Sequence, residues 1–107
     1  MSRIGILCQN KERDRQNIAI AEKICRLPNL IPQGVFTHFA VSDEAEDGKA
    51  FTLCQFDNFM TAIHELENRG IHFAVRHCAN SGAIIVYPKT HLDIVRASIM
   101  LYGLVPS

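Results

Sequence analysis

Residues 34–81, GVFTHFAVSDEAEDGKAFTLCQFDNFMTAIHELENRGIHFAVRHCANS, contain the pattern that decides the fold. The opening residues 34–40 are rich in β-branched and aromatic side chains, which predicts a buried strand. Residues 51–69 predict a helix capped by Gly70, and residues 71–78 predict a second strand. The helix presents one apolar stripe: Phe56, Phe59, Met60, Ile63 and Leu66. Strands separated by such a helix favour parallel βα units.

The sequence on either side continues this alternation. Residues 13–27 have apolar residues at the three-four spacing of a helix face: Ile18, Ala21, Ile24 and Cys25. Residues 42–48 (SDEAEDG) predict an acidic, solvated loop. Residues 83–86 predict a short helix, with Asn80 and Ser81 at its start, and residues 92–96 predict a strand that continues, after a break, through residues 99–102. We therefore expect an α/β fold with parallel strands alternating with helices.

Composition limits the possible functions. The chain has 107 residues, enough for one domain, and its 11 basic and 11 acidic residues cancel, so no nucleic acid or anionic membrane partner is expected. Its apolar runs are too short to span a bilayer and no signal peptide is evident, which makes the cytoplasm the expected location. The four cysteines, expected to be reduced thiols, stand singly: Cys8, Cys25, Cys54 and Cys78.

Polar residues follow the predicted strands where α/β proteins place their sites. Thr37 and His38 lie near the end of one strand, His77 and Asn80 end the next, and Arg96 ends another. With Arg3 and the helix start at Asn80 and Ser81, these groups would suit a phosphate or another anion. The alternatives for the same residues are a helix cap, core histidines and a surface ion pair. A metal site at His72, His77 and Cys78 is the weakest reading, and we expect none.

Several short motifs follow one another in an order that matches one known family. They are MSRIG at residues 1–5, THFA at 37–40, HCANS at 77–81, DIVR at 93–96, LYG at 101–103 and the closing Pro106-Ser107. Together they resemble the N-terminal barrel domain of alanine racemase, an isomerase that uses pyridoxal 5′-phosphate (PLP), over essentially the whole chain. The resemblance implies one partial (β/α)8 TIM-type barrel domain over residues 1–107, roughly the second half of the barrel.

The resemblance also implies cofactor-binding roles for individual residues. Arg3 matches an arginine near the phenolic oxygen of the cofactor and the substrate carboxylate, so it would also bind alanine. Arg96 matches the arginine that faces the pyridine nitrogen, and His77 matches a histidine that orients this arginine. His38 matches a histidine that lines the same pocket.

Four more residues match the phosphate side of that pocket. Asn80 and Ser81 stand at a helix start, and Ser98 and Ile99 match backbone donors to the phosphate. The family usually has glycine where this chain has Ser98. Serine keeps the backbone N–H and adds a hydroxyl, but it restricts how closely the backbone approaches the phosphate.

Two catalytic groups of the family have no match in this sequence. The Schiff-base lysine lies upstream of the MSRIG motif in the family, and none of Lys11, Lys23, Lys49 and Lys89 stands in its motif. The catalytic tyrosine belongs to the C-terminal domain of the partner subunit in the family's homodimer. We therefore expect a fragment of a racemase that interconverts L- and D-alanine and supplies D-alanine for peptidoglycan. On its own it would be inactive and prone to self-association.

Two other functions are compatible with the same residues. The chain could be a non-catalytic PLP-binding or interaction module. It could also be a fragment of a related PLP-dependent racemase that acts on another amino acid.

Overall fold

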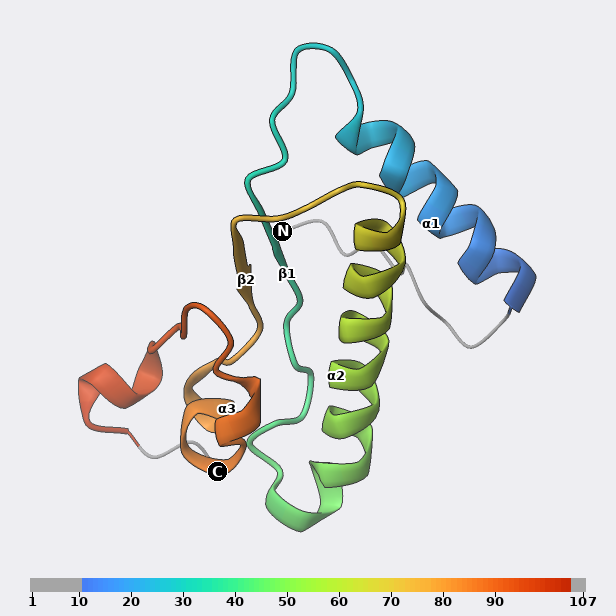
Figure 1. The fold of residues 1–107 in the computed structure, drawn as a ribbon. Coiled ribbons are helices and arrows are strands. Elements are labelled where there is room, and N and C mark those ends of the chain that lie inside the picture. Colours follow the sequence, from blue (N-terminus) through green and yellow to red (C-terminus); the bar gives the residue numbers. More distant parts are fainter. Residues whose placement is uncertain (1–10, 105–107) are drawn as a thin grey trace. The chain divides into compact units, whose positions relative to one another are not determined.

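The computed structural model of the protein describes residues 11–104, in which helices and strands alternate (Figure 1). The chain divides into two compact units. The described part of unit 1 contains residues 11–32 and 58–72, and that of unit 2 contains residues 33–57 and 73–104. The elements are α1 (Lys11–Cys25), β1 (Gly34–Phe36), α2 (Ala45–Asn68), β2 (Val75–His77) and α3 (Ser81–Val86), then the 3-10 helices η1 (Pro88–Thr90) and η2 (Ile99–Tyr102). This order confirms the predicted α/β class.

Unit 1 joins α1 to the second part of α2. Glu22 of α1 accepts ion pairs from Arg69 at 2.9 Å and from Arg26 at 3.2 Å. The helix α2 ends at Asn68, one residue before the predicted end, and the predicted cap Gly70 follows with a φ of +87°, in the left-handed region that glycine adopts without strain. The apolar stripe of α2 is also confirmed, since Ile63 is 0% and Leu66 3% exposed. The side chain of Ile24, expected on the apolar face of α1, is instead exposed.

Unit 2 is built on a two-stranded parallel sheet. Phe36 of β1 lies opposite His77 of β2, and Gly34 lies opposite Val75. The parallel orientation is as predicted, but each strand has only three residues. The predicted strands over residues 34–40 and 71–78 were therefore too long. After Phe36 one further backbone hydrogen bond joins the two segments, from the Thr37 N–H to the His77 carbonyl at 3.3 Å.

The third predicted strand, over residues 92–96, is absent from the described structure. A single parallel bridge joins Ile94 to His77. Leu92 has a φ of +44°, which interrupts extended backbone, and the Asp93 carboxylate accepts the Arg76 N–H at 2.8 Å in place of a strand carbonyl. Residues 99–102, expected to extend this strand, form the 3-10 helix η2 instead.

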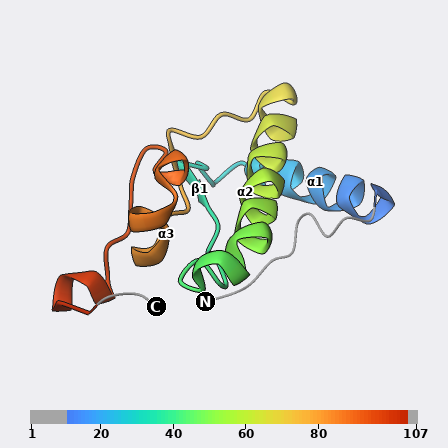
Figure 2. The same ribbon diagram turned by 90° about the horizontal axis from the view of Figure 1, so that it is seen from below.

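All three α-helices begin earlier than predicted, and α1 covers Lys11–Cys25 where residues 13–27 were expected. The helix α2 starts at Ala45, so residues 45–48 are helical and not part of an acidic loop. Glu46 and Asp47 occupy its first turn, where carboxylates interact favourably with the helix dipole. The helix α3 starts at Ser81 and not at residue 83, because the Asn80 side chain caps it. In Figure 2, α3 follows directly from the strand region of unit 2. None of the helices within residues 11–104 is long and apolar enough to cross a membrane.

Candidate functional site

Arg96 connects the ends of the two strands in unit 2. Its Nη2 donates to the carbonyl of Thr37, directly after β1, and to the carbonyl of Cys78, directly after β2, at 3.0 Å each. The Arg96 backbone N–H also donates to the Ala79 carbonyl at 2.9 Å. The arginine is therefore fixed at the strand ends, where the sequence predicted the site.

The Nε of Arg96 is buried and has no hydrogen-bond partner among the described residues. A buried donor without a partner costs about 1–3 kcal/mol, and more when the group is charged. The guanidinium cannot remove this cost by losing its proton, because arginine side chains stay charged in proteins. The geometry therefore leaves one directed N–H available for an acceptor that is not part of residues 11–104.

His77 lies beside the same group of atoms. Its imidazole stacks on the Phe36 ring, with centroids 5.2 Å apart and an interplanar angle of 1°. Burial, and secondarily the positive charge of Arg96, lower the pKa of His77. Its Nδ1 is buried and has no partner within residues 11–104. The side-chain hydrogen bonds found for Arg96 go to main-chain carbonyls and not to this ring, so the orienting role of His77 remains a prediction.

Asn80 forms the centre of a second set of contacts in unit 2. Its Oδ1 accepts the Ala83 N–H at 3.1 Å, which caps α3, and the hydroxyl of Ser42 at 2.6 Å. Its Nδ2 donates to the Phe39 carbonyl at a long 3.5 Å. The side-chain oxygen thus has two partners within the protein already. Asn80 acts here as a cap that ties the loop after β1 to α3.

The predicted phosphate-side residues are brought together by one hydroxyl. Ser81 Oγ accepts the Ser98 N–H at 2.9 Å and the Met100 N–H at 3.5 Å. A serine hydroxyl has two acceptor lone pairs and one donor hydrogen, so these bonds leave the hydrogen available to an anion. Ile99 is the first residue of η2, where the backbone N–H has no acceptor within its own helix. Ser81, Ser98 and Ile99 therefore lie together, and their role in binding a phosphate stays a prediction.

Two predicted residues are not placed in this group. The side chain of His38 is exposed, and Arg3 lies outside the described residues. Conversely, sequence reasoning missed Phe36, Ser42 and the carbonyl groups of Thr37 and Cys78. Carbonyl groups carry no sequence signal, whereas Phe36 directly precedes Thr37-His38 and could have been weighed. Within residues 11–104, no group of three or more His, Cys, Asp or Glu side chains is arranged to hold a metal ion.

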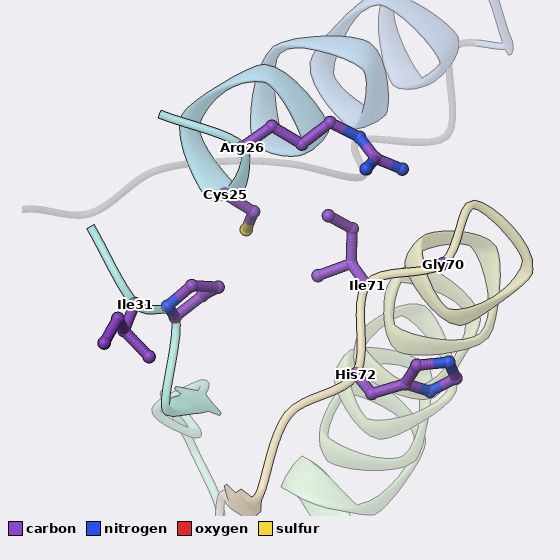
Figure 3. A pocket seen from close by; sticks show the side chains of 7 residues that line it. Cys25, Arg26, Ile31, Gly70, Ile71 and His72 are labelled. Atoms are coloured by element: carbon purple, nitrogen blue, oxygen red, sulfur yellow. The ribbon is translucent and has the colours of Figure 1, made fainter. Parts of the chain in front are cut away.

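Unit 1 contains a separate, shallow depression of about 650 Å³ (Figure 3). None of the predicted cofactor residues that lie within residues 11–104 lines it. Figure 3 shows the Cys25 thiol and the Ile71 side chain at its walls, and burial raises the pKa of that thiol. A protonated thiol is a poor nucleophile, so Cys25 gives no indication of nucleophilic catalysis in this depression. It is lined by Cys25, Arg26, Ile31, Pro32, Gly70, Ile71 and His72.

Comparison with known proteins gives a consistent result. The family described as "Alanine racemase, N-terminal domain" matches residues 1–106. Alanine racemases of Desulforamulus reducens and Methanococcus maripaludis are 45% and 41% identical over 107 residues, which are 100% of this chain and 27% of each relative. The chain thus spans about a quarter of the length of these relatives.

Solved structures of similar proteins agree with the sequence comparison. Alanine racemase of Clostridium difficile 630 in complex with cycloserine has a TM-score of 0.83 at 34% identity, covering 97% of this chain and 26% of that chain. Alanine racemase from Bacillus anthracis with bound L-Ala-P has a TM-score of 0.72 at 31% identity, covering 100% of this chain and 26% of that chain.

Proposed function

The chain belongs to the family of alanine racemase N-terminal domains, and on this premise we propose that it forms one side of the PLP pocket of an alanine racemase. Such an enzyme interconverts L- and D-alanine and supplies D-alanine for cell-wall peptidoglycan. It would act as a homodimer in the cytoplasm. Within it, β1 and β2 would be neighbouring strands of a (β/α)8 barrel, which their parallel pairing supports.

The observation that carries this proposal is the unpartnered Nε of Arg96. A pyridine nitrogen is a hydrogen-bond acceptor, and it would satisfy this buried donor. Because arginine does not give up its proton, Arg96 would keep the ring nitrogen unprotonated. The residues at the strand ends therefore fit the cofactor that the family implies.

The phosphate would be held at the start of α3 and η2. The Ser81 hydroxyl hydrogen and the Ile99 N–H are two donors that the described contacts leave available. The Ser98 hydroxyl would add a third, since the Ser98 N–H is bonded to Ser81. Asn80 would support this arrangement as the helix cap. Arg3 would contact the phenolic oxygen of the cofactor and the substrate carboxylate, and His38 and His77 would line the pocket.

The proton-transfer groups would come from other parts of such an enzyme. When bound, PLP supplies an aldehyde that condenses with the substrate amino group and a ring that withdraws electrons from the α-carbon. All four lysines of this chain are exposed, and Lys89 lies over the ring of Phe56 at 5.6 Å. Tyr102 is 82% exposed, and Tyr87 is buried. We therefore expect the 107 residues by themselves to bind and orient the cofactor but not to racemise alanine.

Binding is tested with pyridoxine 5′-phosphate, which has no aldehyde and so cannot condense with surface lysines. We expect its affinity for the 107-residue chain to fall at least about tenfold in Arg96→Leu, because one charged hydrogen bond is worth about 1.5–3 kcal/mol. The matched control is Arg15→Leu, which removes an exposed arginine of α1 in unit 1 and should leave the affinity unchanged. Equal affinity of the wild-type chain and Arg96→Leu would overturn the assignment of Arg96.

Racemisation is tested in a full-length relative. The 107 residues would replace the matching segment of the Desulforamulus reducens enzyme, to which they are 45% identical. The chimera should support growth of a D-alanine auxotroph, and the same chimera with Arg96→Leu should support it poorly. A folded chimera that binds PLP but does not racemise alanine would count against alanine as the substrate.

A further inference from the structure

Phe36 contacts two of the cofactor residues at once. It is the last residue of β1 and lies opposite His77 in the sheet register. Its ring stacks on the His77 imidazole with centroids 5.2 Å apart, and the guanidinium carbon of Arg96 lies 5.6 Å from its centroid. The Phe36 residue is nevertheless 52% exposed.

The hydrogen bonds of Arg96 do not by themselves fix the orientation of its guanidinium. Both side-chain bonds leave from the single nitrogen Nη2, toward the carbonyls of Thr37 and Cys78. Both bonds hold the same end of the guanidinium, so small tilts of the opposite end, which includes Nε, remain possible. The ring of Phe36 lies near the central carbon and restricts these tilts by a cation–π contact. The direction of the free Nε–H therefore depends on Phe36.

We infer that Phe36 is a positioning residue of the candidate site, whose ring fixes the guanidinium plane of Arg96 and the imidazole of His77. It would thereby direct the Arg96 Nε–H toward the ring nitrogen of the cofactor, and only this last step rests on the proposed function. Phe36 contributes no hydrogen bond and takes no part in proton transfer. An aliphatic residue of similar size would fill the same space without holding either group.

The test uses NMR of the 107-residue chain without cofactor, so it does not depend on PLP binding. In the wild-type chain we expect nuclear Overhauser contacts between the Phe36 and His77 rings, and upfield ring-current shifts of the His77 ring protons and the Arg96 Nε–H. Phe36→Leu should abolish the shifts, whereas Phe36→Tyr should retain them. The control Phe51→Leu removes a phenylalanine that is 55% exposed and has no ring contact among the described residues, and should change neither signal.

A second readout is the titration midpoint of His77. Burial is the main cause of its lowered pKa, with Arg96 as the charged neighbour that adds to it. Removing the Phe36 ring uncovers the imidazole and releases the guanidinium, so both causes weaken and the midpoint should rise in Phe36→Leu but not in Phe36→Tyr. The affinity for pyridoxine 5′-phosphate should fall about 3- to 10-fold in Phe36→Leu, as for a lost cation–π contact.

The outcomes separate the two claims. Absent contacts between the rings of Phe36 and His77, or shifts of His77 and Arg96 that survive Phe36→Leu, overturn the positioning role. If Phe36→Leu fails to fold, the wild-type contacts and Phe36→Tyr decide the question. Correct ring contacts without any binding of pyridoxine 5′-phosphate would leave Phe36 as the positioning residue and overturn the proposed function instead.

Discussion

The substitution Asn80→Ala should destabilise unit 2 through two identifiable losses. The first is the cap of α3, where Oδ1 accepts the Ala83 N–H at 3.1 Å, and such caps contribute about 0.5–2 kcal/mol. The second is the acceptor for the Ser42 hydroxyl at 2.6 Å. Ser42 is 2% exposed, so its hydroxyl would be left buried without a partner at a cost of about 1–3 kcal/mol. We expect a total loss of about 2–4 kcal/mol in the free energy of unfolding.

This loss is large compared with the whole stability of a small domain, which is typically about 5–15 kcal/mol. Urea unfolding followed by far-UV circular dichroism measures it, as a lower midpoint at unchanged slope. The control Asn68→Ala removes an exposed asparagine at the end of α2 and should change the stability by less than about 0.5 kcal/mol.

A double-mutant cycle with Ser42→Ala isolates the buried hydrogen bond. Ser42→Ala alone leaves Oδ1 bonded to the Ala83 N–H and should cost about 1 kcal/mol. The double variant has no orphaned hydroxyl, so its loss should fall short of the sum of the single losses by about 1–2 kcal/mol. An Asn80→Ala chain as stable as the control, or strictly additive losses, would refute this account of Asn80 as the link between the loop after β1 and α3.

Two further predictions concern buried atoms of unit 2. Burial raises the pKa of Cys78 to about 11, against the opposing effect of Arg96, so the thiol contributes stability below about pH 9 that is lost as the pH rises toward 11. The melting temperature should therefore fall more steeply over this range in the wild-type chain than in Cys78→Ala, and parallel curves would contradict it. Gly82→Ala should cost about 1–3 kcal/mol in the urea assay, because its Cβ would meet the Ser42 carbonyl oxygen at 3.1 Å and the Asp43 nitrogen at 3.2 Å. Unchanged stability of this variant would show that the loop at Ser42 yields.

The sequence by itself determined the order of elements as far as α3, and the family. Periodicity over α2 spans many residues, so a local count was sufficient to predict the helix, its buried stripe at Ile63 and Leu66, and its cap at Gly70. The alternation of strands and helices similarly predicted parallel pairing. The order of the motifs assigns Ser81, Ser98 and Arg96 to one site only through the resemblance to the family, and that assignment stays a prediction.

Only the tertiary structure decided where strands end and which atoms remain free. Residues 34–40 and 92–96 have strand-like composition, but side chains take the place of strand neighbours. Thr37 and Ala40 bond through their backbone groups to the side chains of Arg96 and Gln55, and the Asp93 carboxylate, not a backbone carbonyl, accepts the Arg76 N–H. Such bonds join residues far apart in the chain, and no local pattern encodes them. The free Nε–H of Arg96 and the exposed ring of Phe36 depend on the same long-range contacts. The local sequence thus predicts which helices and strands form, whereas the hydrogen-bond partners of individual atoms depend on how the whole chain packs.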